Sequence, residues 1–180
     1  MPATDYDRVA HLYDAYVCNL SLNRQFDLIF IPFHSFAEIG DPAQERKALQ
    51  AIRTHLSPTG RFICTLHNPS WRLKWVTGQR RKLGDFPLSD GNLLTLSSVE
   101  NYDSVSGCVN GTQFYEVRSY DGTVAAHMAV DLHFRLHSCC EFQSLAEAAG
   151  FVPVHLYGDY SYAPFEPDKS PFMVWVLREA

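Results

Sequence analysis

Two apolar segments separated by one clearly bounded helix constrain the fold of this chain more than any other feature of its sequence. Residues 26–33 are rich in Ile, Leu and Phe without alternation, which is typical of a strand covered on both faces in a parallel sheet. Asp41 and Pro42 form an N-cap and first-turn pair for a helix that ends at the turn 57–60. Residues 61–66 supply the next strand. This order predicts a βαβ unit with a right-handed crossover in a parallel sheet.

The middle of the chain, residues 82–137, has the pattern of an antiparallel sheet. Asn110-Gly111 and Asp121-Gly122 are hairpin turn signals, and residues 128–136 alternate strictly between apolar and polar. The residues expected on the packed face of this last strand are Met128, Val130, Leu132, Phe134 and Leu136. Those expected on the other face, toward water or a cleft, are His127, Asp131, His133, Arg135 and His137. The segment therefore predicts an inserted antiparallel β cap.

The C-terminal part of the chain predicts one helix and two closing strands. Ser138 and Glu141 have the spacing of a capping box, and Gly150 stands where a helix C-cap belongs. Residues 151–157 and 171–177 have strand composition, with an aromatic and proline-rich segment between them.

Composition limits the class of protein. With 180 residues, of which 46% are hydrophobic, the chain can form one sizeable core, so we expect a single domain over residues 1–180. A net charge of -5 without a large basic stretch excludes a typical nucleic-acid partner or an anionic membrane surface. The longest apolar run is far below the roughly 20 residues of a membrane span. The five cysteines lack CxxC spacing, which favours a reducing, cytoplasmic location without disulfides.

Four segments, taken in order, carry the pattern of one known family. They are YDRVAHLYDAYV at 6–17, FDLIFIPFHSFAEI at 26–39, LQAIRTHLSPTGRFICTLHNP at 49–69, and EFQSLAEAAGFVPVHLYGDYS at 141–161 with SPFMVWVLREA at 170–180. Together they resemble the small-molecule branch of the class I S-adenosylmethionine-dependent methyltransferases, which includes glycine and amino-sugar N-methyltransferases. The resemblance implies an N-terminal helix over the cofactor, the fourth and fifth strands of the sheet, and the closing helix and hairpin. The expected fold is α/β: a partial Rossmann-like sheet, mostly parallel with a closing antiparallel hairpin, and an antiparallel β cap at about 82–137.

One part of the family pattern is missing from the sequence. Class I methyltransferases place two βα units between the first helix and the fourth strand, with a glycine-rich turn and a strand-end acid that hold the nucleoside. No GxGxG lies between Asn19 and Phe26, and two such units need roughly sixty residues. Either the chain keeps only the second half of the fold, or another polypeptide supplies the first half. The strand at 26–33 would then be an exposed sheet edge, which we expect the helix 6–17 or a second copy of the chain to cover.

His34, just past the carboxyl end of the strand at 26–33, is the candidate catalytic residue. Methyl transfer is an in-line displacement, so the protein chiefly aligns the reactants and removes a proton where needed. His34 can act as general base or orient the acceptor; alternatively, it is a histidine bonded to a loop carbonyl.

Further candidates come from the resemblance. Tyr6, Tyr13 and Phe33 correspond to positions near the cofactor, although a tyrosine stripe at helical spacing also fits core packing. Asn68, Trp71 and Tyr160 are the candidate substrate-binding residues; Asn68 before Pro69 is equally a turn signal. No metal site is expected, because His127, Asp131 and His133 share a face without a fourth ligand.

The family resemblance implies transfer of a methyl group from S-adenosylmethionine to nitrogen or oxygen of a small molecule, with a partner chain completing the cofactor site. The alternative is an inactive relative that serves as a binding or assembly protein. Possible partners are the small-molecule substrate and a second chain, identical or different, at the exposed sheet edge.

Overall fold

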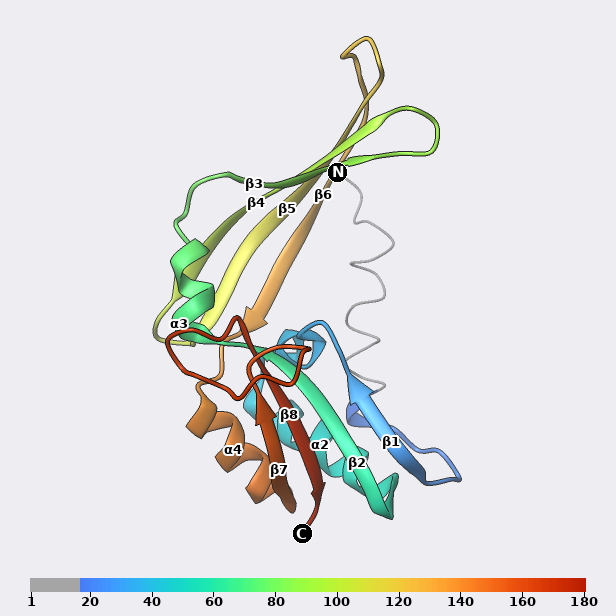
Figure 1. The fold of residues 1–180 in the computed structure, drawn as a ribbon, viewed down its shortest axis with the longest axis vertical. Helices are drawn as coiled ribbons and strands as arrows, with labels where there is room; N and C mark the ends of the chain where they lie inside the picture. Colours follow the sequence, from blue (N-terminus) through green and yellow to red (C-terminus); the bar gives the residue numbers. More distant parts are fainter. Residues whose placement is uncertain (1–16) are drawn as a thin grey trace.

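The computed structural model describes residues 17–180 and arranges them as two four-stranded sheets. The sheets follow one another along the long axis of the molecule (Figure 1). Two helices, α2 (Pro42–Thr54) and α4 (Cys139–Ala148), lie on one face of the lower sheet. Tyr6, Tyr13 and the rest of the predicted helix before Val17 lie outside the described residues. Within residues 17–180, no helix is long and apolar enough to cross a membrane.

The lower sheet, sheet A, has the strand order β1 (Phe26–Ile31), β2 (Leu56–His67), β8 (Phe172–Glu179) and β7 (Phe151–Tyr157). β1 and β2 pair in parallel, and β8 is antiparallel to both β2 and β7. Three of the four strands, β1, β2 and β7, therefore run in one direction and β7–β8 is an antiparallel closing hairpin, as predicted, although β1–β2 is the one pair in sheet A that is hydrogen-bonded in parallel. The cause is the closing hairpin, which inserts β8 between β2 and β7.

The turn predicted at residues 57–60 is a bulge within β2 rather than a gap before it. Phe26 pairs with Leu56 and Leu28 pairs with Arg61, so most of the turn loops out of the ladder. Gly60 is needed here, because a β-carbon at this position would lie 2.9 Å from the backbone oxygen of Phe26. β2 therefore begins at Leu56, ahead of the predicted start at Arg61.

Both long helices begin where the sequence predicts. The Asp41 carboxylate accepts hydrogen bonds from the Ala43 and Gln44 amides at 3.0 and 2.8 Å, which caps α2. At α4, the Ser138 hydroxyl accepts from the Glu141 amide at 3.2 Å, and the Glu141 carboxylate accepts from the Ser138 amide at 2.8 Å. The capping box therefore satisfies two amides that the helix leaves without partners.

Loss of this cap gives a simple stability prediction. Replacing Ser138 with alanine should lower the free energy of unfolding by about 1 kcal/mol, since the N-cap acceptor is lost. Urea denaturation followed by circular dichroism measures the change. Ser144→Ala is the matched control, because Ser144 is exposed on the same helix and its replacement should change stability by less than about 0.5 kcal/mol. Equal effects of the two substitutions would contradict the capping role.

The upper sheet, sheet B, is an antiparallel meander of β3 (Arg81–Pro87), β4 (Leu93–Asp103), β5 (Cys108–Arg118) and β6 (Val124–Arg135). The turn predicted at Asp121-Gly122 is correct. There the Gly122 amide, at φ 84°, donates to the Ser119 carbonyl at 2.9 Å.

The second turn prediction in this sheet, at Asn110-Gly111, is wrong. Both residues lie inside β5, and the chain turns at residues 104–107 instead. Gly111 is explained by crowding, because a β-carbon there would lie 2.2 Å from the Val99 carbonyl oxygen and 3.0 Å from Glu100 Cγ.

The predicted faces of β6 hold only for its second half. Val130, Phe134 and Leu136 are buried as expected, but Met128 is 42% exposed. Sheet B projects beyond sheet A in Figure 1, so among residues 17–180 no second layer packs on the first half of β6. The other exception is His137, which was placed on the water-facing side and is buried. It follows the end of β6, where strand alternation no longer applies.

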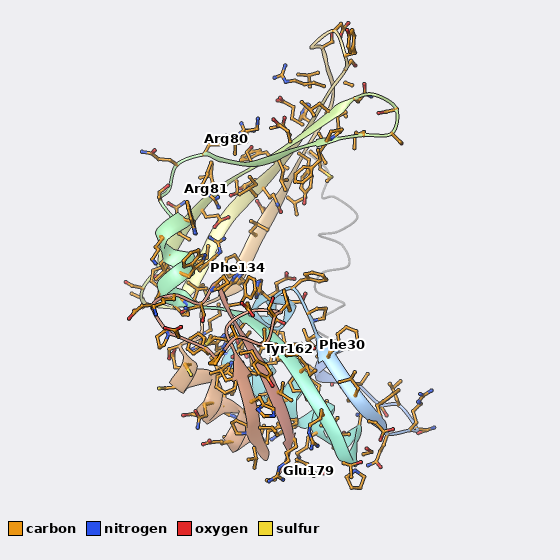
Figure 2. All side chains as sticks on the ribbon, viewed as in Figure 1. Phe30, Arg80, Arg81, Phe134, Tyr162 and Glu179 are labelled. Carbon is orange, nitrogen blue, oxygen red and sulfur yellow. The ribbon has the colours of Figure 1, made fainter. Side chains whose placement is uncertain are left out.

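One face of sheet A carries the hydrophobic core and the other is open at β1. Ile31 is buried, whereas Leu28 and Phe30 are 52% and 62% exposed. The prediction that this strand is covered on both faces is therefore wrong among residues 17–180. β1 is the last strand of sheet A, and α2 and α4 cover the opposite face. Phe30 lies on this outer strand in Figure 2.

Candidate functional site

His34 occupies a strained turn at the carboxyl end of β1. It precedes the short 3-10 helix η1 (Ser35–Ile39), with φ 65°, and Phe33 before it has φ 56°. Two successive non-glycine residues in the left-handed region cost about 1–3 kcal/mol each unless the surroundings hold them. Such strain gathers at functional sites, and α/β sheets bind ligands at the carboxyl ends of their strands.

His34 lies in the middle of a row of contacting rings, the ring stack, that joins the two sheets. Its imidazole stacks on that of His67, at the end of β2, with 3.8 Å between ring centroids. His67 in turn contacts Phe134 of β6 at 5.0 Å. On the other side, His34 lies 5.6 Å from Phe172, and Phe172 lies 5.2 Å from Tyr160. Figure 2 shows Phe134 at the junction of the two sheets.

Both histidines of the stack are neutral at pH 7. Burial, assisted by the positive charge of Arg72, lowers the pKa of His34 to about 4, against a hydrogen bond to the Leu66 backbone that raises it. Burial lowers the pKa of His67 to about 2, with contributions from His34 and Arg72. The backbone group of Leu66 that His34 binds lies in strand β2, so it is not the loop carbonyl of the predicted alternative. His34 Nδ1 is nevertheless buried without a partner among the described residues.

Arg72, at the end of the short helix α3 (Pro69–Arg72), is a positive charge that lowers the pKa of both imidazoles. Its Nη2 binds the carboxylate of Glu100, and the two side chains are only 15% and 5% exposed. The guanidinium also lies over the Phe134 ring, 5.2 Å from its centroid. Arg72 Nη1 is buried and has no partner in the described part of the chain.

Asn68 caps a helix at a turn, which agrees with the reading of Asn68-Pro69 as a turn signal. Its Oδ1 accepts from the Ser70 amide at 3.2 Å and caps α3, while Nδ2 donates to the Pro167 and Ser170 carbonyls, both at 2.7 Å. The side chain is buried and connects α3 to the loop before β8. Substrate binding by Asn68 remains a prediction.

Trp71 and Tyr160 are both partly exposed near the junction of the sheets. Trp71 is 36% exposed, and Lys74 Nζ lies over its ring, 4.8 Å from the ring centroid. Tyr160 is 56% exposed and packs on Phe172, so the structure connects Tyr160, but not Trp71, to the ring stack of His34.

The polar face of β6 has local partners. His133 Nδ1 and Asn110 Oδ1 are 2.7 Å apart, and Asp131 accepts from Thr112 at 3.2 Å. In the part of the chain that the structure describes, no three His, Cys, Asp or Glu side chains are grouped so that they could hold a metal ion.

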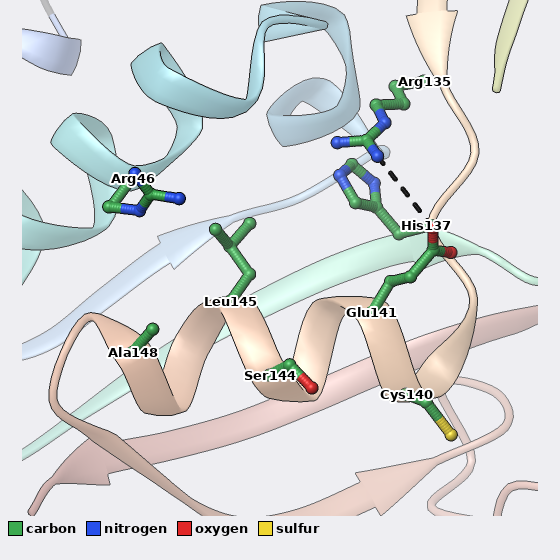
Figure 3. Close-up of a pocket in the computed structure, with 8 residues that line it drawn as sticks. All are labelled: Arg46, Arg135, His137, Cys140, Glu141, Ser144, Leu145 and Ala148. Atoms are coloured by element: carbon green, nitrogen blue, oxygen red, sulfur yellow. Dashed lines mark ion pairs between the residues drawn. The ribbon is translucent and has the colours of Figure 1, made fainter. Parts of the chain in front are cut away.

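A shallow pocket of about 450 Å³ lies elsewhere, against α4 (Figure 3). No predicted site residue lines it. Beside it, the fully buried Glu45 carboxylate approaches His137 Nε2 at 2.9 Å and Arg135 Nη1 at 3.4 Å. Burial and the Glu45 charge raise the pKa of the Cys64 thiol. The contacts of Glu45 with His137 and Arg135 hold α2 against the end of β6, so we assign Glu45 a structural role.

Solved structures share this architecture, although no family model and no curated protein matches the chain. An S-adenosylmethionine-dependent methyltransferase from Clostridium acetobutylicum aligns with TM-score 0.74 and 20% identity over 91% of this chain and 62% of that protein. The CcbJ methyltransferase from Streptomyces caelestis gives TM-score 0.70 and 19% identity over 91% and 61%. The sugar N-methyltransferase KedS8 from a Streptoalloteichus species gives 0.64 and 21% over 91% and 60%. The chain has the class I methyltransferase fold.

The structural match covers only part of each relative. The chain spans about three fifths of the length of these structural relatives. Phe33, at the end of β1, is 78% exposed, and its contact with a cofactor stays a prediction. The first glycine of the chain is Gly40, where a β-carbon would lie 2.8 Å from His133 Nε2, so that glycine accommodates the cap. Residues 17–39 therefore contain no glycine at which the backbone could approach the nucleoside of S-adenosylmethionine closely.

The sequence analysis named His34 but missed the residues that surround it in the ring stack. His67 stands directly before Asn68, at the carboxyl end of the second parallel strand, and that position is a signal that could have identified it. Arg72, Phe134 and Phe172 come from distant parts of the chain and carry no local signal.

Proposed function

We propose that the chain is the acceptor-side part of an S-adenosylmethionine-dependent methyltransferase that acts on nitrogen or oxygen of a small molecule. The main support is the His34 and His67 stack at the carboxyl ends of β1 and β2 in a class I methyltransferase fold. When bound, the cofactor would supply the electrophilic methyl group. KedS8 is a sugar N-methyltransferase, which favours nitrogen over oxygen as the acceptor atom here.

In this proposal His34 orients the acceptor and is not a strong base. A general base works best with a pKa near the operating pH, and a pKa of about 4 is too low to remove a proton from an ammonium group efficiently. The neutral imidazole can instead accept a hydrogen bond from an uncharged amine or hydroxyl at Nδ1. The stack on His67 and the strained backbone fix the ring, which is what alignment for an in-line displacement requires.

The other predicted residues keep their roles as proposals. Tyr160 borders the ring stack and contributes an exposed ring to the acceptor side, with Trp71 at the base of the cap. Asn68 supports the loop before β8. Tyr6, Tyr13 and Phe33 are proposed to face the cofactor. The antiparallel insertion is proposed to cover the site, because Phe134 near its inner end contacts His67. Sheet A and the insertion are proposed to form one domain, and the protein is proposed to be cytoplasmic.

A second chain, identical or different, is proposed at β1. Its free edge and the exposed Leu28 and Phe30 are a template for pairing. Light scattering over a concentration series should show association, and Phe30→Asp should weaken it at least about tenfold. Tyr120→Asp, at a fully exposed position of the turn between β5 and β6, is the control. An unchanged monomer at all concentrations would leave only a different partner chain.

Calorimetry and methyl transfer test the function directly. The purified chain is titrated with S-adenosylmethionine and S-adenosylhomocysteine, and transfer of a labelled methyl group to small amines and alcohols is followed. Transfer that rises with association of the chain would support the proposal. Transfer that is strictly proportional to monomer would contradict the need for a second chain.

Replacing His34 with asparagine should reduce methyl transfer about 100-fold, because the fixed imidazole that accepts a hydrogen bond from the substrate and orients it is lost. The initial rate at saturating acceptor measures the effect. His155→Asn, an exposed histidine on β7, is the control and should leave the rate unchanged. A His34→Asn rate within threefold of the original would remove His34 from the mechanism.

The second candidate function is a non-catalytic binding or assembly protein with this half fold. The free edge of β1, with exposed Leu28 and Phe30, favours it. Absence of heat and of transfer at every concentration, combined with stable association through β1, would support this function over methyl transfer.

A further inference from the structure

Two buried polar groups without partners lie at the same ring stack. His34 Nδ1 and Arg72 Nη1 are both shielded from water and make no hydrogen bond among the described residues. Buried polar atoms in native proteins are almost always paired, and an unpaired one costs about 1–3 kcal/mol. Two such atoms at the carboxyl end of parallel strands therefore point to groups of a ligand.

The guanidinium of Arg72 is held rigidly in this position. Its Nη2 binds Glu100, and its planar face lies over Phe134, which itself contacts His67. Gly111 leaves the space that Glu100 occupies, since a β-carbon there would approach Glu100 Cγ at 3.0 Å. A donor whose rotamer is already fixed loses little entropy when it binds a further oxygen.

The charges around Arg72 favour a ligand with an uncharged oxygen. The carboxylate of Glu100 offsets the positive charge of Arg72, and both imidazoles are neutral at pH 7. A buried carboxylate or phosphate of a ligand would lack a net counter-charge, and a buried charge without one is strongly unfavourable. A hydroxyl or carbonyl oxygen can accept from Arg72 Nη1 without that penalty.

We propose that Arg72 is a substrate-binding residue that donates through Nη1 to a hydroxyl or carbonyl oxygen of the acceptor molecule, while Glu100 positions Arg72 and excludes anions. This inference rests on the proposed function, because it assigns the acceptor to the His34 site. The acceptor would therefore carry an uncharged oxygen close to its reacting amine or hydroxyl.

The test uses three probes of similar size and a readout that needs no cofactor. Ethanolamine carries a neutral oxygen beside its amine, glycine a carboxylate, and propylamine a methyl group instead. Each is titrated into the whole chain while the imidazole NMR signals of His34 and His67 are followed. Ethanolamine should bind about tenfold more tightly than propylamine, the typical effect of one hydrogen bond to a charged donor. Equal binding of ethanolamine and propylamine would overturn the inference.

Variants separate recognition from folding. Arg72→Lys should remove most of the preference for ethanolamine over propylamine, since the rigid fork is lost. Arg80→Lys is the matched control, because Arg80 also lies over a ring, that of Phe114 at 4.3 Å, away from the ring stack of His34. Glu100→Gln should leave Arg72 uncompensated and shift preference at least about fivefold toward glycine. Should Arg72→Lys fail to fold, Glu100→Gln decides alone, and an unchanged preference there overturns the inference.

The outcomes also distinguish this inference from the proposed function. Selective ethanolamine binding without methyl transfer would retain the Arg72 site and remove the catalytic function. Methyl transfer with identical acceptor KM values in the original chain and Arg72→Lys would retain the function and remove the assignment of Arg72.

Discussion

Replacing Phe142 with alanine should lower the free energy of unfolding by about 4 kcal/mol, the typical cost of a fully buried Phe→Ala change. Phe142 of α4 has no exposed surface and packs edge-on against Phe36, with 5.6 Å between ring centroids. Its ring also lies 5.4 Å from Trp175 of β8 and 6.1 Å from His137. The side chain thus joins α4, η1 and sheet A, and its removal leaves a cavity that none of these elements can fill. Urea denaturation at 25 °C, followed by tryptophan fluorescence, measures the change.

The matched control for this substitution is Tyr120→Ala in the turn between β5 and β6. Tyr120 is fully exposed, so removing its ring should change the free energy of unfolding by less than about 0.5 kcal/mol. A loss below about 1.5 kcal/mol for Phe142→Ala would mean that α4 is not packed on sheet A as described.

The helices and the βαβ unit could be predicted because their signals are local. Asp41 and Ser138 cap helices through amides within three residues, so the sequence around each cap contains nearly all the information needed. The resemblance to class I methyltransferases is likewise confirmed at the level of the fold, since solved structures of such enzymes align with TM-scores of 0.70 and 0.74.

The errors all concern interactions between distant segments. Strand composition at residues 26–33 suggested burial on both faces, but composition does not say whether a second layer is present, and Leu28 and Phe30 are exposed. Asn110-Gly111 has the residues of a hairpin turn, yet Gly111 is a small residue demanded by the close approach of β4. The alternation of β6 predicts that His137 faces water, but its side chain is buried against Glu45 of α2.

The candidate site shows the same division. His34 was identified from its position after a strand, which is a rule about one segment. His67, Arg72 and Phe134 complete the stack from three further elements, and Glu100 joins from a fourth. The low pKa of His34, which changes its proposed role from base to orienting group, arises from burial and from Arg72. Neither cause can be read from the residues beside His34 in the sequence.

The free energy of unfolding should decrease steeply as the pH falls from about 6.5. In the unfolded chain His34 and His67 take up protons near pH 6.5, whereas in the folded chain their pKa values are lowered to about 4 and about 2. Below pH 6.5 the unfolded state therefore binds more protons, and stability rises with pH until about 6.5 and then levels off. For His34, a decrease from 6.5 to about 4 corresponds to a loss of about 3 kcal/mol by pH 4. His67 adds a further loss that continues below pH 4.

Urea denaturation at intervals between pH 4 and pH 8 measures this dependence, and two variants assign it. His67→Asn should flatten the curve between pH 4 and pH 6.5, because asparagine does not titrate and relieves the burial of His34 in the stack. His127→Asn, at an exposed position of β6, should leave the curve unchanged. A curve for the original chain that is level from pH 4.5 to pH 7 would show that the two imidazoles are solvated. The rigid neutral acceptor proposed at His34 Nδ1 would then have no physical basis.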